Sequence, residues 1–140
     1  MIEIYTDGSC LTNPGNGGWA AIIIEDGKIK KISGNEKNTT NNRMELLAAI
    51  MALKKIKSSS DVIIFTDSVY VKNGITEWMV NWKKNGWKNA NKKPVKNKDL
   101  WSKLDTLCEK NNVSWKWVKG HSSNKYNNLA DELATGAIKN

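Results

Sequence analysis

The amino-acid sequence predicts an α/β fold, with five strands in one mixed sheet and helices on both faces of that sheet. Three strand patterns joined by turns open the chain, which indicates an antiparallel meander. Each of the two later strand patterns follows a helical segment, and a helix crossover joins parallel strands. With 140 residues the chain can bury one core, so we expect a single domain covering residues 1–140.

The first three strand patterns fill the opening of the chain. Apolar and polar residues alternate from Ile2, and we expect this strand to end in a turn at residues 7–9, which read Asp-Gly-Ser. The second and third strands are expected at residues 18–25 and 28–33, with a tight hairpin turn at residues 26–27 between them.

Helices and two further strands are predicted in the rest of the chain. Apolar residues repeat at helical spacing over residues 41–56 and cover much of the circumference, so this helix should be largely buried. The β-branched run at residues 62–65 is typical of a parallel strand buried on both faces. The remaining expectations are one or two short helices within residues 69–85, a lysine-rich loop, an amphipathic helix around residues 100–108, a strand at residues 113–119, a polar loop at residues 120–126 and a closing helix at residues 127–139.

The formal net charge of +8 is placed unevenly along the chain. The first 70 residues carry eight basic and eight acidic side chains, whereas the last 70 carry fourteen basic and six acidic ones. Residues 82–98 contain seven lysines and no acid, and Trp78, Trp82 and Trp87 interleave with the lysine-rich segment. Such a run attracts a polyanion by neutralising phosphates, and the indole rings favour nucleic acid over the alternative of a solvated loop.

Cysteine content and hydropathy restrict the compartment. Cys10 and Cys108 are too few for a disulfide framework or a tetrahedral zinc site, so we expect reduced thiols and a cytoplasmic protein. No apolar run approaches the length of a signal-peptide core or a membrane span, so no membrane location is expected. Nothing in the sequence requires more than a monomer.

Two strand ends carry nearly the same sequence. Residues 4–9 read Ile-Tyr-Thr-Asp-Gly-Ser and residues 64–68 read Ile-Phe-Thr-Asp-Ser, so Asp7 and Asp67 each stand where a strand leaves the sheet. If the two strands are parallel neighbours, the strand order reverses between them. Ligands in open α/β sheets bind outside the carboxyl ends of the strands at such a point, so both aspartates should face one crevice.

Two helical acids are candidates to join this pair. Glu45 lies near the start of the long helix, where an acid is also common because it interacts favourably with the helix dipole. Asp131 stands in the closing helix beside Glu132, and its alternative interpretation is a plain exposed helix acid. Neither residue indicates a function by itself.

Together, the four acids predict a metal site. Converging carboxylates repel one another by about 4 kcal/mol for each close pair at an effective dielectric near 20. A bound divalent cation removes this penalty, and all-oxygen ligation favours Mg²⁺, with Mn²⁺ as a substitute, over zinc or copper. Two such ions can activate a water and stabilise the leaving oxygen in phosphodiester cleavage. The candidate ligands are Asp7, Glu45, Asp67 and Asp131.

His121 is the only histidine in the chain and lies in a polar segment directly after the last predicted strand. Histidine exchanges protons near neutral pH, so an acid/base or product-release role is one interpretation. An incidental surface histidine is the other.

Several motifs together resemble the type 1 ribonucleases H of bacteria, with nearly constant spacing from Ile4 to Ala134. The motifs are TDGSCLTNPGNGGW, TTNNRMEL, FTDSVYVKNGITEW, NWKKNGWK, KKPVKNKDLW, WVKGH and ADELA. The resemblance implies the ribonuclease H fold, with strand order 3-2-1-4-5. It also implies an endonuclease that hydrolyses the RNA strand of RNA/DNA hybrids and leaves 5′-phosphate and 3′-hydroxyl ends.

The resemblance assigns the catalytic residues by position. Asp7, Glu45, Asp67 and Asp131 match the metal ligands, and His121 matches the catalytic loop histidine. The sequence departs from the family pattern directly after His121, where a second glycine, another histidine and an Asn-Glu pair are often found. This difference affects what His121 can contribute to turnover. The four acids still match the family pattern.

The resemblance also assigns contacts to each strand of the substrate. Asn13, Asn41 and Asn42 match minor-groove residues, whose amides can test for the RNA 2′-hydroxyl. The remaining matches concern the DNA strand. They are Thr40 and Asn81 for a phosphate pocket, and Trp78 and Trp82 for a channel that holds sugars. The lysine-rich stretch with Lys83, Lys84 and Lys88 matches the basic protrusion that supports binding of the hybrid as a whole.

Two other functions remain as alternatives. A DNA-cutting or strand-transferring enzyme of the same fold also uses clustered acids with Mg²⁺, but the TTNNRMEL motif and the basic stretch disfavour it. A hybrid-binding module without catalysis would need only the basic stretch, and four intact acids argue against it.

Overall fold

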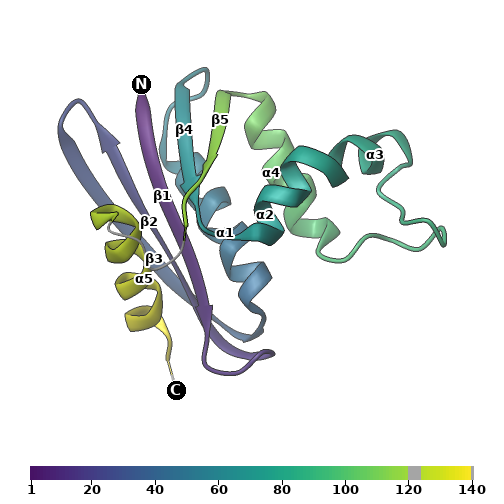
Figure 1. Ribbon diagram of the computed structural model, residues 1–140, viewed down its shortest axis with the longest axis horizontal. Helices are drawn as coiled ribbons and strands as arrows, with labels where there is room; N and C mark the ends of the chain where they lie inside the picture. The colour runs from purple at the N-terminus through teal and green to yellow at the C-terminus, as the bar shows by residue number, and fades with distance from the viewer. Residues whose placement is uncertain (120–123, 140) are drawn as a thin grey trace.

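The computed structural model describes residues 1–119 and 124–139 (Figure 1). Within these residues, five strands form one sheet in the order β3-β2-β1-β4-β5, which confirms the predicted fold class. β1 to β3 are antiparallel, whereas β4 pairs parallel with both β1 and β5. The strands are β1 (Ile2–Cys10), β2 (Gly15–Glu25), β3 (Lys28–Thr39), β4 (Asp61–Thr66) and β5 (Asn112–Trp117).

Helices cover both faces of the sheet, as expected from the crossovers. α1 packs on β1 and β2 and against α4, whereas α5 packs on β1 and β2 from the opposite face (Figure 1). Neighbouring residues of β1 show the two faces, because Ile4 belongs to the core under α1 and Tyr5 stacks on Phe65 under α5. The helical elements are α1 (Asn41–Lys55), α2 (Val69–Asn73), the π-helical turn η1 (Gly74–Trp78), α3 (Met79–Lys84), α4 (Lys98–Glu109) and α5 (Lys125–Ala137).

The turn predicted at residues 7–9 is wrong, because β1 continues to Cys10. Its parallel pairing with β4 stops two residues before Asp7, but its antiparallel pairing with β2 runs on to the end of the strand. The Asp-Gly-Ser segment is therefore held in the sheet by its pairing with β2 alone.

β3 is longer than the sequence pattern suggested, since it runs to Thr39 instead of ending at residue 33. The additional residues are polar and mostly exposed because β3 is the edge strand and pairs with β2 only. An edge strand that packs little apolar surface lacks the alternation from which strands are predicted. β2 likewise begins three residues earlier than expected, at Gly15.

The middle of the chain forms one helical segment from Val69 to Lys84, interrupted by the π-helical turn, where one or two short helices were expected. α5 begins at Lys125, inside the segment predicted as a loop, because Asn124 caps it by accepting a hydrogen bond from the backbone N–H of Asn127 at 2.9 Å. The other helix and strand boundaries differ from the expected ones by one or two residues. Among the described residues, no helix is both long and apolar enough to cross a membrane.

Candidate active site

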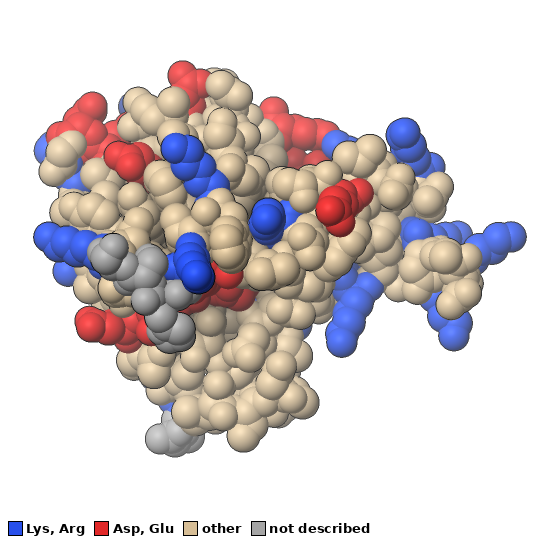
Figure 2. Space-filling view, in the orientation of Figure 1, with Lys and Arg blue, Asp and Glu red and all other residues tan. Residues whose placement is uncertain are grey.

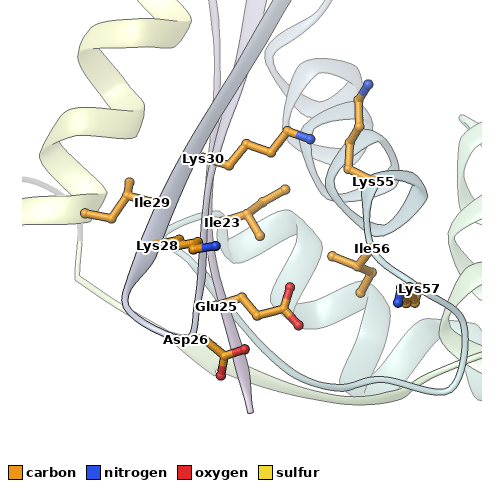
Figure 3. Close-up of a pocket in the computed structure, with 9 residues that line it drawn as sticks. All are labelled: Ile23, Glu25, Asp26, Lys28, Ile29, Lys30, Lys55, Ile56 and Lys57. Atoms are coloured by element: carbon orange, nitrogen blue, oxygen red, sulfur yellow. The ribbon is translucent and has the colours of Figure 1, made fainter.

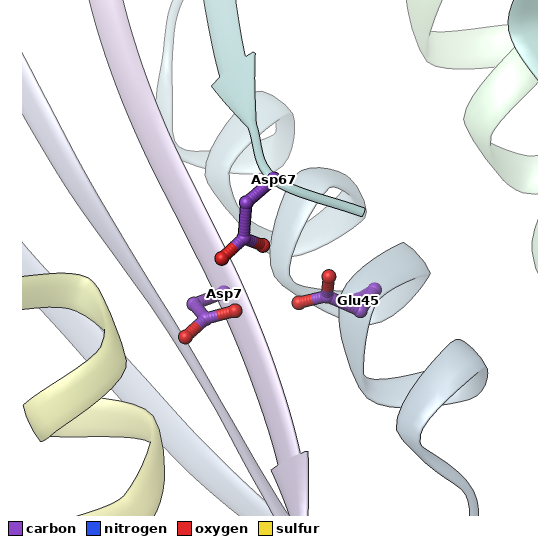
Figure 4. Close-up of side chains that lie close together, drawn as sticks. All are labelled: Asp7, Glu45 and Asp67. Atoms are coloured by element: carbon purple, nitrogen blue, oxygen red, sulfur yellow. The ribbon is translucent and has the colours of Figure 1, made fainter. Parts of the chain in front are cut away.

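Three carboxylates from separate elements converge at one edge of the sheet (Figure 4). Asp7 comes from β1, Glu45 from α1, and Asp67 from the residue after the end of β4. Each offers one carboxylate oxygen such that these atoms all lie within 4.8 Å of one another. No other group of three or more possible metal-ligating side chains is this close among the described residues.

Strand register explains why the two aspartates meet. The last parallel pair between β1 and β4 joins Tyr5 to Phe65. Asp7 and Asp67 each follow this pair by two residues, so they project at the same level beyond the parallel part of the sheet. The nearly identical sequences at the two strand ends therefore correspond to equivalent positions, as the predicted crevice requires.

Glu45 reaches the aspartates because α1 lies very close to β1. A Cβ atom at Gly8 would overlap the backbone of Met44 and Glu45, so only glycine permits this approach. Met44 and Leu46 on either side are fully buried, and Glu45 itself is 9% exposed. Glu45 is therefore not an exposed acid that merely complements the helix dipole.

Asp131 lies at the rim of the same site. This residue of α5 is exposed, and it lines a cavity of about 90 Å³ together with Asp7 and Asp67. The adjacent acid, Glu132, is also exposed and does not line the cavity. The other lining residues are Gly8, Asn127 and Asn128.

The cluster is electrostatically unfavourable without a cation. Burial raises the pKa of Asp7 to about 8, a hydrogen bond with Glu45 opposes the rise, and the proximity of Asp131 and the charge of Asp67 add to it. Burial also raises the pKa of Glu45 well above its ordinary value, and the charge of Asp7 is the next cause. The site therefore favours either bound protons or a compensating positive charge.

The donor set fits a hard divalent cation. Glu45 Oε1 is buried and has no hydrogen-bond partner within the described structure, so this oxygen is available to a ligand. Carboxylate oxygens of this kind are the ligands that Mg²⁺ and Mn²⁺ prefer. We conclude that the residues present are chemically suited to hold such an ion.

Four predicted substrate residues gather at the start of α1. Thr40 caps the helix, its hydroxyl accepting a hydrogen bond from the backbone N–H of Arg43 at 3.2 Å. The backbone N–H of Asn41 donates to Asn13 Oδ1 at 3.3 Å, which ties the loop after β1 to the helix. Asn41, Asn42 and Asn13 are exposed, and the helix begins only four residues before Glu45.

Trp78, Asn81 and Trp82 line a second cavity, of about 290 Å³, with Tyr70 and Lys96. The two tryptophan rings contact each other with their centroids 5.8 Å apart, and both are half-buried against the core. The sequence predicted that these tryptophan rings contact nucleic acid. In the structure, one part of each ring packs against the core and another part lines this cavity.

The lysine-rich stretch forms a protrusion at the end of the molecule beyond α3. Figure 2 shows Lys and Arg side chains gathered there. Lys84 and Lys88 are exposed, as expected for contact with a polyanion. Lys83 differs, because its Nζ lies 3.2 Å from Asp105 and 3.3 Å from Glu109, so acids of α4 already balance its charge.

Two residues that the sequence interpretation missed support the site, Trp117 through Asp67 and Lys72 through Trp117. Trp117, at the end of β5, donates a hydrogen bond from Nε1 to the backbone oxygen of Asp67 at 3.3 Å. The Nζ of Lys72 lies 5.0 Å from the centroid of the same indole ring. The signal that could identify Trp117 is its place at the carboxyl end of a predicted parallel strand.

A hydrogen-bond network that connects α1, α2 and α4 was also absent from the sequence interpretation. Arg43 pairs with Asp99 at 2.8 Å and donates to Asn97 at 3.2 Å, which links α1 to the start of α4. The Tyr70 hydroxyl accepts hydrogen bonds from Asn97 at 3.0 Å and from Trp101 Nε1 at 2.9 Å. His121, the predicted loop histidine, lies outside the described residues.

The most voluminous cavity among those described, of about 530 Å³, lies away from these groups (Figure 3). It is bordered by the β2–β3 hairpin and by Lys55, Ile56 and Lys57 at the end of α1. Glu45 precedes Lys55 by ten residues, which corresponds to about 15 Å of helix. This cavity is therefore separate from the carboxylate site.

Comparisons with known proteins agree with this geometry. The RNase H family model matches residues 1–139 of the chain. The ribonuclease H of Francisella philomiragia subsp. philomiragia is 61% identical over 134 residues, which cover 96% of this chain and 88% of the relative. The ribonuclease H of Francisella tularensis subsp. novicida shows the same identity and coverage.

Solved structures show the same fold. LC9-RNase H1, a type 1 RNase H with the type 2 active-site motif, has a TM-score of 0.85 at 30% identity and covers 97% of this chain and 71% of its own. LC11-RNase H1, solved in complex with an RNA/DNA hybrid, has a TM-score of 0.69 at 26% identity, with coverage of 99% and 96%. Since the family model spans almost the whole chain and relatives are 61% identical over most of their own length, this chain belongs to the ribonuclease H family of endoribonucleases.

Proposed function

We propose that the chain acts as a single ribonuclease H domain that hydrolyses the RNA strand of RNA/DNA hybrids and leaves 5′-phosphate and 3′-hydroxyl ends. The observation that carries the proposal is the cluster of buried Asp7 and Glu45 with half-buried Asp67, and Asp131 at its rim, in a chain of this family. Relatives of the same fold are known in complex with RNA/DNA hybrids, which supports the choice of substrate.

The four carboxylates would hold Mg²⁺, in two positions when substrate is bound, and Mn²⁺ should substitute. A divalent cation at this site would polarise the scissile phosphate and lower the pKa of the attacking water. Asp7 and Glu45 must give up the protons that their raised pKa values favour, so metal affinity should fall as pH decreases. Trp117 would help to hold the backbone of Asp67 in place through its hydrogen bond to the Asp67 oxygen.

The RNA strand would lie across the start of α1. Asn13, Asn41 and Asn42 are exposed there, and their amides can donate to or accept from a 2′-hydroxyl, which DNA lacks. Because Glu45 lies one helical turn further along α1, an RNA strand recognised at this point passes close to the carboxylates.

The DNA strand would follow the cavity beyond α2. Trp78 and Trp82, which line this cavity with Asn81, would offer apolar ring surface to the sugars. We assign phosphate binding to Asn81 and Thr40 on the family resemblance. Lys84 and Lys88 add charge further along the protrusion, and Lys83 contributes less because its charge is already balanced.

His121 completes the proposed residue set as a group that moves a proton or assists product release after cleavage. Its position in sequence, four residues after Trp117 at the end of β5, supports this assignment. We further propose that the enzyme works in the cytoplasm, where its two free cysteines would stay reduced, and that it works as a monomer.

The test is a cleavage assay with purified protein, MgCl₂ and four substrates of equal sequence. We expect cleavage of the RNA strand of a hybrid, and none of duplex DNA, single-stranded RNA or double-stranded RNA. A Glu45→Gln variant should bind the hybrid without turnover, because it loses a metal ligand and no basic contact. Equal cleavage of duplex DNA would indicate a DNA-processing enzyme, and wild-type binding without cleavage would indicate a binding module.

A further inference from the structure

A second group of basic and aromatic side chains lies beside the carboxylates, on the β5 side of the site. Lys72 of α2 and Lys116 and Trp117 of β5 help to line a cavity of about 100 Å³. Both lysines are exposed, and Trp117 is 44% exposed. Figure 2 shows basic side chains over the region of α2 and β5. These lysines do not belong to the protrusion beyond α3, so they form a separate basic patch.

Two contacts place this patch next to Asp67. The indole Nε1 of Trp117 donates a hydrogen bond to the backbone oxygen of Asp67 at 3.3 Å, and Lys72 Nζ lies 5.0 Å from the centroid of the same indole ring. The last pair between β4 and β5 joins Thr66 to Trp117, so the indole stands beside the residue that precedes Asp67. The ring therefore holds the ammonium group of Lys72 close to the carboxylate site.

No acid neutralises either lysine of the patch. Among residues 1–119 and 124–139, the basic side chains that form ion pairs are Arg43 and Lys83. The face of an indole ring attracts the ammonium group of Lys72 but does not cancel its charge, so this group can still bind an anion. Unpaired cations beside an exposed aromatic ring are typical of surfaces that bind a sugar-phosphate backbone.

The position of the patch on α2 indicates which strand it binds. Tyr70 lines the cavity that we assign to the DNA strand, whereas Lys72 lies over Trp117. Residues two apart in a helix point in different directions, so α2 stands between that cavity and the patch. The strand that is cut must place a phosphate at the carboxylates, which Trp117 adjoins through Asp67. The cut strand is therefore the one that reaches the patch.

We propose that Lys72 and Lys116 bind phosphates of the RNA strand next to the scissile position, and that Trp117 is the positioning residue for Lys72. This role rests on the proposed cleavage of hybrids. The RNA strand would then be held by its phosphate charges on the β5 side of the site, in addition to the recognition of its 2′-hydroxyls at the start of α1.

The experiment measures kcat/KM with MgCl₂ on a duplex whose ribonucleotides are confined to a short central block of one strand, which fixes the place of cleavage. A neutral methylphosphonate replaces one phosphate at a time, first in the cleaved strand and then in its complement. At the phosphate that Lys72 contacts, the neutral linkage should lower kcat/KM of the wild type roughly fivefold, as expected for an exposed charge pair of about 1 kcal/mol. The same linkage should have little effect in Lys72→Gln, which has no charge left to lose.

Three further variants separate the roles within the patch. Lys72→Arg keeps the charge and the contact with the indole, so it should retain the sensitivity of the wild type. Trp117→Leu should lose the sensitivity at the Lys72 position and keep it at a second position, which Lys116→Gln should abolish. A general loss of folded protein would lower kcat/KM for every substrate alike. Lys55→Gln removes an exposed lysine at the distant cavity and is the matched control, with the sensitivity of the wild type.

The two strand series decide the assignment. If every neutral linkage in the cleaved strand has the same effect on the wild type and on Lys72→Gln, the phosphate contact is wrong. A difference found only with linkages in the complement would place the lysines on the DNA strand and overturn the choice of the RNA strand. A wild-type protein that leaves an unmodified hybrid intact would instead overturn the proposed function, and the role of the patch with it.

Discussion

Replacing Asp7 by asparagine should stabilise the metal-free protein while abolishing cleavage. The carboxylate is 5% exposed and close to three other acids, so its charge opposes folding. Asparagine has nearly the same shape and no charge. The substitution should therefore remove an electrostatic penalty without leaving a cavity.

The pKa of Asp7 gives the sign and the upper limit of this effect. Its value is about 8 in the folded protein against 3.8 for an ordinary aspartate, so the folded state binds more protons between these pH values. The contribution of Asp7 to wild-type stability must then fall as pH rises from about 4 to 8. At about 1.36 kcal/mol for each pH unit, the loss is at most about 6 kcal/mol. Relaxation of solvent and side chains reduces such penalties, so we expect a gain of about 2 to 4 kcal/mol in the variant.

The assay is urea unfolding in EDTA at pH 4.5 and pH 9, followed by circular dichroism. Asp7→Asn should exceed the wild type in unfolding free energy at pH 9, and the difference should shrink strongly at pH 4.5. Glu132→Gln, which removes an exposed acid from α5 outside the cavity, is the control and should change little. Equal stabilities at pH 9, or a gain that does not depend on pH, would refute the electrostatic reasoning.

Two further predictions concern the substrate surface. Changing Lys84, Lys88, Lys92 and Lys93 to glutamine should weaken hybrid binding and reduce the magnitude of its salt slope by up to about 3.6, at about 0.9 for each lost phosphate contact. The control changes Lys28, Lys30, Lys55 and Lys57, which border the distant cavity, and an equal effect there would attribute binding to overall charge. Tyr70→Phe should lower the unfolding free energy by about 1 to 3 kcal/mol in urea, because the fully buried Trp101 loses its acceptor. Tyr126→Phe makes the same chemical change on α5, and an equal loss in both variants would contradict a specific role for the Tyr70 hydroxyl.

Local sequence patterns predicted the elements with a strong apolar periodicity. α1 and β4 were placed within one residue at each end because their buried faces repeat at helical or strand spacing. The far half of β3 could not be predicted in this way. It is an exposed edge strand whose hydrogen bonds to β2 are made by the backbone, and backbone bonding leaves no pattern of side chains.

Contacts between side chains that lie far apart in the sequence could not be predicted either. Lys83 resembles its neighbours in the lysine-rich stretch, and only the packing of α3 beside α4 shows that Asp105 and Glu109 balance its charge. The link from Tyr70 to Trp101 joins residues 31 positions apart. No local spacing rule connects such residues, because their contact depends on how whole helices pack.

The carboxylate site combines both kinds of information. The repeated sequence located Asp7 and Asp67, since each lies two residues beyond the last parallel pair between β1 and β4. The family resemblance added Glu45 and Asp131. Only the tertiary structure showed how deeply each acid is buried, because burial depends on the approach of α1 to Gly8 and on the placement of α5.

The sequence by itself thus determined the fold class, the family and the acids that a cation requires, because these follow from periodicity and from residues at fixed spacing. The tertiary structure decided which of those acids are buried together and which lysine is already paired. These properties depend on distances between elements that are far apart in the chain, and such distances are set only when the helices pack on the sheet.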